Sequence, residues 1–166
     1  MTDESRPQVV KAKGSAARVR EVLIEHGLAE EIVTFEQSTK TAQMAADAMG
    51  CELGQIVKSL VMVADGRPVV ALVAGDRRGD ASAIAAEVGA TAARMADADT
   101  VREATGYAIG GVSPFALPAS LIVLVDDSLE RFDVVYPAAG TPQSMVRMPR
   151  QLLLDIAGGR VARISH

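Results

Sequence analysis

The 166-residue sequence predicts a single compact α+β domain with a mixed, mainly antiparallel sheet. The clearest observation is a hairpin, because two apolar, β-branched stretches, 55–64 and 68–74, are joined through Asp65-Gly66-Arg67. Short capped helices then fall irregularly between further strands, unlike the regular alternation of a parallel α/β sheet. Since no internal repeat, low-complexity segment or linker divides the chain, we expect one domain at 15–166 behind a loose polar tail at 1–14.

Ser15 and Asp80 are predicted to cap the helices that follow them, Pro149 suits the first turn of a helix, and most predicted helices end at or just before a glycine. The five helices are expected at 15–27, 41–49, 80–88, from 97 or 99 to about 106, and 149–157. The remaining strands are expected at 32–35, 121–125, 133–136, 144–148 and 161–164.

Composition excludes several classes of protein. Hydrophobic residues make up 49% of the chain, enough for a substantial core, yet no apolar run is long enough to span a membrane. The single cysteine excludes an internal disulfide and a multi-cysteine metal site. The first residues lack the basic and apolar segments of a secretory signal, which favours a cytoplasmic protein without a membrane partner.

The net charge of −4 argues against a general nucleic-acid coat protein, and no DNA partner is expected. Basic residues nevertheless cluster near both ends of the chain. They are Lys11, Lys13, Arg18 and Arg20 near the start, and Arg147, Arg150, Arg160 and Arg163 near the end. Two interpretations stay open: ordinary solvated arginines, or contacts to the end of a structured RNA.

Lys58 is a lone cation within the apolar run 56–63. A lysine on the solvent face of an edge strand is ordinary. Apolar neighbours on both sides, however, indicate a largely covered strand, and a lysine that emerges from such a strand is a candidate for a functional site. Its charge suits a ligand that is negative or becomes negative during a reaction.

A second candidate is the turn Gly110-Gly111-Val112-Ser113-Pro114. Two adjacent glycines allow backbone N–H groups to approach a ligand closely, and Pro114 stiffens the turn by restricting itself and Ser113. Bare amides on a stiff turn suit an oxyanion or a phosphate. The plain alternative is a tight connection between a helix and a strand.

Conventional catalytic groups are not assembled by this sequence. Ser113 does not sit in a Gly-x-Ser-x-Gly turn, and the two histidines, His26 and His166, are poorly placed to activate it or Cys51. Zinc ligands and a dinucleotide fingerprint are lacking, so no metal or cofactor is predicted. Asp126 and Asp127 could bind a cation, although a turn with a helix cap is the better interpretation.

The strand segment Ile56-Val57-Lys58-Ser59-Leu60, the segment 105–115 and the closing Arg160-Val161-Ala162 resemble the YbaK/EbsC-type aminoacyl-tRNA deacylases. These proteins are relatives of the editing domain of bacterial prolyl-tRNA synthetases. The resemblance covers residues 20–165 and implies a curved mixed sheet. It also implies hydrolysis of the ester between a wrong amino acid and the 3′ end of a tRNA, with a mischarged proline tRNA as one candidate substrate.

The resemblance assigns catalytic roles to Lys58, Gly110 and Gly111. It assigns substrate contacts to Thr34, Phe35, Ser59, Val112, Ser113, Pro114 and Thr141. Amides at the two glycines would stabilise the oxyanion, Lys58 would hold a phosphate or orient the substrate, and water would attack with help from the terminal ribose hydroxyl. Relatives that act on cysteinyl-tRNA carry an acidic residue in the segment matching 141–147, where this chain has none.

Two functions are therefore compared. The first is a free-standing hydrolase that edits mischarged aminoacyl-tRNA, alone or beside a synthetase. The second is a non-catalytic module of the same fold that binds tRNA or a synthetase. An oxyanion site favours the hydrolase, because a binding module does not need one.

Overall fold

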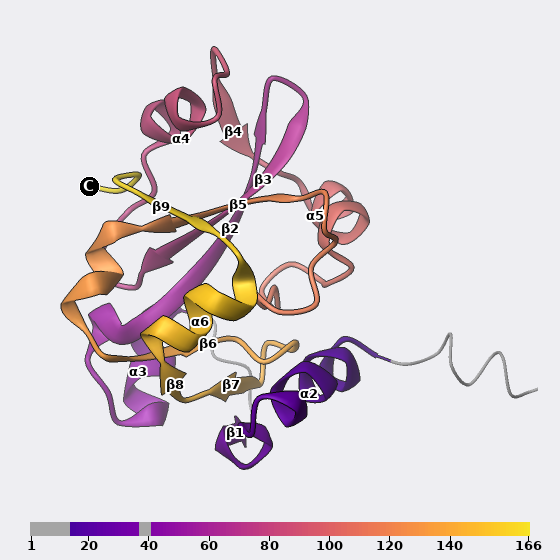
Figure 1. Cartoon of the computed structure of the whole chain (residues 1–166), viewed down its shortest axis with the longest axis vertical. Helices are drawn as coiled ribbons and strands as arrows, with labels where there is room; N and C mark the ends of the chain where they lie inside the picture. Colours follow the sequence, from indigo (N-terminus) through magenta and orange to yellow (C-terminus); the bar gives the residue numbers. More distant parts are fainter. Residues whose placement is uncertain (1–13, 37–40) are drawn as a thin grey trace, which may run out of the picture.

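The computed structural model describes residues 14–36 and 41–166, so the predicted tail lies outside the described residues except for Gly14. In this part of the chain five α-helices surround a curved, mixed sheet, which confirms the α+β class (Figure 1). The helices are α2 Ser15–Glu25, α3 Ala42–Met49, α4 Ala81–Glu87, α5 Ala98–Thr105 and α6 Arg150–Ala157. The strands are β1 Ile32–Thr34, β2 Ile56–Ala64, β3 Arg67–Ala74, β4 Ala93–Met95, β5 Ile122–Asp126, β6 Val134–Pro137, β7 Ser144–Val146, β8 Met148–Pro149 and β9 Arg160–Ala162.

The main sheet has the strand order β8-β6-β2-β3-β5-β9, with β4 also paired to β2. The β2–β3, β2–β4 and β6–β8 pairs are antiparallel, whereas β2–β6, β3–β5 and β5–β9 are parallel. The separate β1–β7 pair is antiparallel. The parallel pairs join strands that are distant in sequence, so α-helices and long loops must cross between them.

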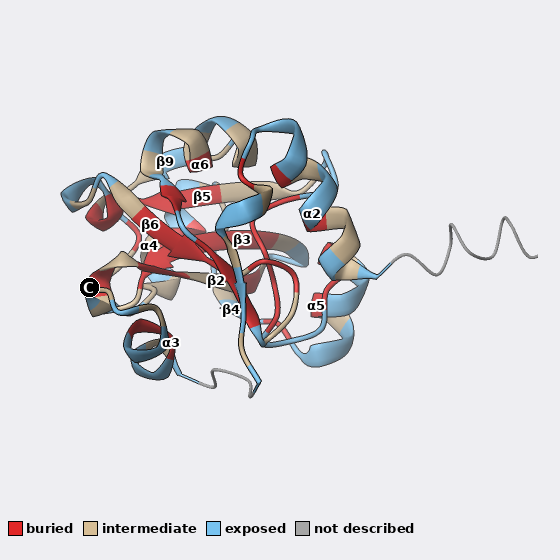
Figure 2. Cartoon of the chain, turned by 90° about the horizontal axis from the view of Figure 1, so that it is seen from below, coloured by how far each residue is buried: buried red, intermediate tan, exposed pale blue. Residues whose placement is uncertain are grey.

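The predicted hairpin is the centre of the core. Asp65 and Gly66 both have positive φ angles, +48° and +84°, as a two-residue type I′ turn requires. From residue 69 to residue 74 every residue of β3 is buried (Figure 2). Clusters of aliphatic side chains cover both faces of the strand. The hairpin therefore provides a rigid support for the rest of β2.

Apart from shifts of one or two residues at strand ends, the structure differs from the expected strands in two places. The predicted strand 144–148 is divided at exposed Arg147, since β7 pairs with β1 whereas β8 pairs with β6. Strand β4 was not predicted. It has only three residues, and so short a stretch shows no clear alternation of apolar and polar side chains. Pro149 occupies the N-cap position of α6 and not its first turn, and Gly14, not Ser15, occupies the N-cap position of α2.

Asp126 ties the end of the chain to the sheet. This completely buried carboxylate accepts hydrogen bonds from the Ser128 N–H at 3.1 Å, the Ile164 N–H at 2.8 Å and the Ser165 hydroxyl at 2.7 Å. Burial alone would raise the pKa of Asp126, but these hydrogen bonds outweigh it and hold the pKa below its usual value. The expectation of a capped turn at this position is confirmed.

One edge of β2 is only partly covered. On that side β6 pairs with residues 56–57 and β4 pairs with residues 62–64. Within the described ranges, no strand pairs with residues 58–60 on this edge. The sheet therefore has a gap beside the middle of β2, at the position of Lys58.

Candidate active site

A pocket of about 300 Å³ opens beside the gap in β2. Its walls come from β2, α3, the glycine turn and the loop that precedes β7. The lining residues are Thr41, Ala42, Ala45, Ile56, Val57, Lys58, Ser59, Leu60, Gly110, Val112, Ala138, Thr141, Pro142, Ser144 and Met145. Segments far apart in the sequence thus bring Lys58, Ser59, Gly110, Val112 and Thr141 together, as the sequence hypothesis requires.

Lys58 is the one cation among the residues named as lining this pocket. Its side chain is half-buried, and its Nζ donates a hydrogen bond to the backbone carbonyl of Arg77. Burial lowers the pKa of Lys58 below its ordinary value, the charge of Arg78 lowers it further, and Asp76 opposes both effects. A partly desolvated ammonium group gains more from an anionic ligand than a fully hydrated one does.

Hydrogen bonds between residues at its two ends hold the loop that carries the glycines. The buried Tyr107 hydroxyl donates to the carbonyl of Phe115, and the Phe115 N–H donates to the Ser113 hydroxyl at 3.3 Å. The guanidinium of Arg18 lies 4.8 Å from the centre of the Tyr107 ring. Ser113 is completely buried and Pro114 lines a different hollow, so in this structure both support the loop and neither lines the pocket.

Gly110 and Gly111 have different surroundings. Gly110 has a φ of +88° and open space where a Cβ would lie, so its backbone faces the pocket. The N–H of Gly111, expected from the sequence to face the substrate, instead donates to the Ala108 carbonyl at 3.0 Å. A Cβ on Gly111 would lie 3.0 Å from Cδ of Pro142, so this glycine allows two loops to pack closely. Among described residues, the N–H groups of Gly110 and Val112 have no hydrogen-bond partner.

Thr141 belongs to this pocket and to a neighbouring one of about 380 Å³. Its hydroxyl shares a hydrogen bond of 2.8 Å with the Ser144 hydroxyl. Thr34 and Phe35, predicted to contact substrate, line the neighbouring pocket together with Arg20. The two pockets share the Thr141–Ser144 wall and therefore lie side by side.

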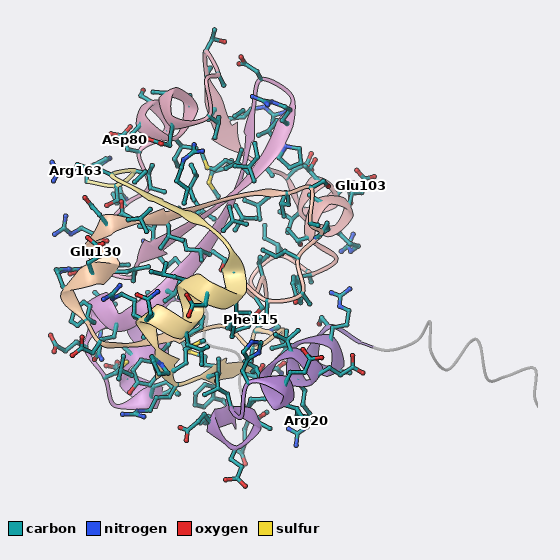
Figure 3. All side chains as sticks on the ribbon, viewed as in Figure 1. Arg20, Asp80, Glu103, Phe115, Glu130 and Arg163 are labelled. Carbon is teal, nitrogen blue, oxygen red and sulfur yellow. The ribbon has the colours of Figure 1, made fainter. Side chains whose placement is uncertain are left out.

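The basic clusters separate in the structure. Arg163 lies beside the C-terminus and Arg20 lies on α2 at the opposite end of the molecule (Figure 3). Arg160 pairs with Glu87 at 3.2 Å and Arg163 with Asp127 at 3.4 Å, whereas Arg150 donates to the Phe132 carbonyl at 3.0 Å. These three C-terminal arginines therefore have local partners, while Arg20 lines a pocket; Lys11 and Lys13 lie outside the described residues.

Helix α3 lines the pocket although sequence reasoning did not include it. Thr41 caps the helix by accepting the Met44 N–H at 3.1 Å, and Ala42 and Ala45 complete that wall. The alanine-rich sequence of this helix carried a signal for the wall, because small side chains on one face of a helix leave space for a ligand. For the described residues, we find no cluster of acidic, histidine or cysteine side chains that could hold a metal ion. None of the described helices is long and apolar enough to cross a membrane.

The sequence of this chain defines it as an aminoacyl-tRNA editing domain. Residues 36–156 match the family model described as the aminoacyl-tRNA editing domain, and the chain belongs to this family. The resemblance to YbaK/EbsC-type proteins and to the editing domain of prolyl-tRNA synthetases is thereby confirmed.

The relatives include free-standing proteins and parts of synthetases. The chain is 33% identical over 153 residues to the multifunctional Ser/Thr-tRNA deacylase ProXp-y of Escherichia coli, covering 88% of this chain and 91% of that protein. It is 36% identical over 132 residues to the uncharacterised protein YwhH of Bacillus subtilis, covering 79% and 83%. It is also 38% identical over 91 residues to the proline–tRNA ligase of Citrifermentans bemidjiense, covering 55% of this chain but 16% of the ligase.

A solved structure confirms the fold. The crystal structure of a candidate trans-editing enzyme for prolyl-tRNA synthetase superimposes with a TM-score of 0.83 at 38% sequence identity. The match covers 92% of this chain and 97% of that one.

Proposed function

We propose that this protein hydrolyses the ester bond of aminoacyl-tRNA that carries a small, uncharged amino acid, and that it does so in the cytoplasm. One observation carries the proposal: Lys58 and Gly110 line a single pocket at a gap in the sheet, and the Gly110 N–H has no hydrogen-bond partner among the described residues. Membership of the editing family supports the same chemistry.

Ester hydrolysis passes through a tetrahedral intermediate whose carbonyl oxygen becomes negative. The N–H groups of Gly110 and Val112 have no other partner among the described residues and are the proposed donors to that oxygen. The Tyr107–Phe115 hydrogen bond holds the loop in place before substrate arrives. Such preorganised donors lower the barrier because they need no rearrangement during the reaction.

Water is the proposed nucleophile. Its oxygen bonds to the ester carbon, the bond from that carbon to the ribose oxygen breaks, and the ribose oxygen takes up a proton. A neighbouring ribose hydroxyl is placed to move that proton. Cys51 is not among the residues lining the pocket, and burial and the charge of Glu52 raise the pKa of its thiol, so it is a poor nucleophile.

Lys58 is proposed to bind the phosphate that precedes the terminal nucleoside. The neighbouring pocket then receives part of that nucleoside, with the Phe35 ring available for base stacking and Arg20 for a second phosphate contact. The shared Thr141–Ser144 wall would lie between the nucleoside and the aminoacyl group.

The walls of the Lys58 pocket favour a small, neutral side chain. Apart from Lys58 they present alanine and other aliphatic groups together with the hydroxyls of Thr41, Thr141 and Ser144. No carboxylate occurs among the named lining residues, so a cationic amino acid finds no partner there. Serine and threonine fit these walls, and the name of the E. coli relative agrees with that choice.

The test is a panel of aminoacyl-tRNAs incubated with excess protein. We expect release of serine, threonine or alanine well above the spontaneous rate, and no acceleration for arginine or phenylalanine. Equal acceleration of all esters would contradict the proposed side-chain class, and no acceleration of any ester would contradict the hydrolase itself.

A further inference from the structure

The backbone of Ser59 occupies a special position on the uncovered edge of β2. Residues of an antiparallel strand direct both N–H and C=O to alternate sides. The type I′ turn makes Ala64 and Arg67 a hydrogen-bonded pair, so the even-numbered residues of β2 bond to β3. The odd-numbered residues face the other edge, as the Ala96 N–H donating to the Val61 carbonyl at 3.0 Å confirms.

By this alternation Val57 faces β6, Val61 faces the segment that follows β4, and Ser59 faces the gap. In the described part of the chain, neither the N–H nor the C=O of Ser59 has a partner on that side. Ser59 also lines the pocket, while its hydroxyl is buried without a partner and is inaccessible to a ligand. The groups of Ser59 offered to a ligand are therefore those of its backbone.

The N–H and C=O of Ser59 point to the same side of the strand. They are complementary to a ligand whose acceptor meets the N–H and whose donor meets the C=O, with the two groups spaced as in a single amino-acid residue. The α-aminoacyl ester has this arrangement, since its ammonium group and its ester carbonyl flank one carbon atom. A fatty acyl or a hydroxy-acyl ester lacks the ammonium group. The complementarity does not involve the amino-acid side chain.

We propose that the aminoacyl group binds as a one-residue strand on Ser59. Its ammonium group donates to the Ser59 carbonyl, and the Ser59 N–H donates to the ester carbonyl oxygen. This inference rests on the proposed hydrolase function and extends it. It makes the α-amino group a required recognition element and adds Ser59 to the amides that stabilise the oxyanion.

The first experiment compares seryl-tRNA with 3-hydroxypropionyl-tRNA, which lacks only the α-amino group. Both esters are placed on the same tRNA, and each enzymatic rate is divided by the spontaneous rate of the same ester. We expect the acceleration to fall at least tenfold without the amino group, because a charge-assisted hydrogen bond is lost. Equal acceleration of both esters would overturn this inference and leave the hydrolase standing, whereas failure to accelerate seryl-, threonyl- and alanyl-tRNA alike would overturn both.

The second experiment separates the backbone of Ser59 from its side chain. Ser59→Pro removes the N–H that no described strand uses, together with the hydroxyl, and it also fixes φ and restricts Lys58. We expect both esters to slow by about a hundredfold, as for loss of an oxyanion donor. Ser59→Ala keeps the N–H, and we expect it to retain the preference for seryl-tRNA. Folding is checked by thermal melting. A folded Ser59→Pro variant with the wild-type rate would contradict the proposed N–H donor, and if that variant does not fold, the ester comparison alone decides.

Discussion

Lys58 reaches the pocket from a strand whose other residues are mostly apolar and buried. The apolar neighbours that made it conspicuous in the sequence also cause its desolvation in the fold. Its burial could be predicted for that reason. The hydrogen bond to the Arg77 carbonyl could not, because it depends on how the loop after β3 folds back.

We predict that Lys58→Ala lowers kcat/KM for aminoacyl-tRNA about 30-fold or more, since a partly buried contact to a phosphate is lost. The melting temperature should stay within a few degrees of wild type. Because the folded state lowers the pKa of Lys58, it disfavours the charged form, and removal of the ammonium group costs little stability. Single-turnover hydrolysis and a thermal melt on one preparation provide the measurement. A folded variant with an unchanged rate would exclude Lys58 from the site.

The pH dependence gives an independent check on Lys58. As pH rises through its lowered pKa, Lys58 loses its charge earlier than an ordinary lysine, so enzymatic hydrolysis should decline on the alkaline side. Lys58→Arg keeps a positive charge throughout this range, and its residual activity should not show the decline. The rates are measured after subtraction of spontaneous hydrolysis at each pH. The same alkaline decline in both proteins would assign it to another group.

At the scale of elements, the glycine turn and the loop before β7 form one unit. The sequence predicted a stiff turn with bare amides but could not separate the two glycines. Only the fold shows that the positive φ belongs to Gly110 and the close packing to Gly111. Ser113 also required the fold, because its burial results from packing around Tyr107 and Phe115.

We predict that Gly111→Ala lowers turnover about tenfold while tRNA binding changes much less. The added Cβ would meet Pro142 at 3.0 Å and must displace one of the two loops by a few tenths of an ångström. Phosphate contacts elsewhere should preserve binding. Single-turnover rates and filter binding are compared with those of Gly14→Ala, whose glycine precedes α2, has no positive φ and has open space where a Cβ would lie. Loss of binding with a normal rate for bound substrate would make the turn a docking element.

The hairpin and the helices show what local pattern can predict. Asp65-Gly66 specifies its turn by itself, and Asp80 and Asp97 cap α4 and α5 as expected. The gap in β2 could not be predicted, because it depends on where β6 and β4 stop along the strand. The hydrophobic pattern of a strand indicates which of its faces is buried, but not which residues of two distant strands stand opposite each other.

At the scale of the whole molecule, the sheet is held to the C-terminal segment through Asp126. We predict that Asp126→Ala costs about 3 kcal/mol of unfolding free energy, because buried donors lose their acceptor. Asp127→Ala is the matched control and should cost about 0.5 kcal/mol or less, since Asp127 is only half-buried and its partner Arg163 is solvent-exposed. Urea unfolding at neutral pH measures both. Equal effects of the two substitutions would contradict the proposal that Asp126 holds the C-terminal segment to the sheet.

The contribution of Asp126 to the free energy of unfolding should depend on pH. Since folding lowers the pKa of Asp126, its contribution is present above the unfolded pKa of about 4 and is lost as pH falls through the folded value. The stability difference between wild type and Asp126→Asn should therefore shrink in acid. This control also shows whether a loss of activity at low pH comes from the site or from unfolding.

The whole molecule is either a catalyst or a binding module, and one measurement distinguishes them. Seryl-tRNA is incubated with protein at a concentration far below that of the tRNA, and free serine is followed with time. The proposed function predicts many equivalents of serine released per protein, and a much slower release with Lys58→Ala. Binding of the tRNA without release of serine above the spontaneous rate would contradict the account and identify a non-catalytic member of the family.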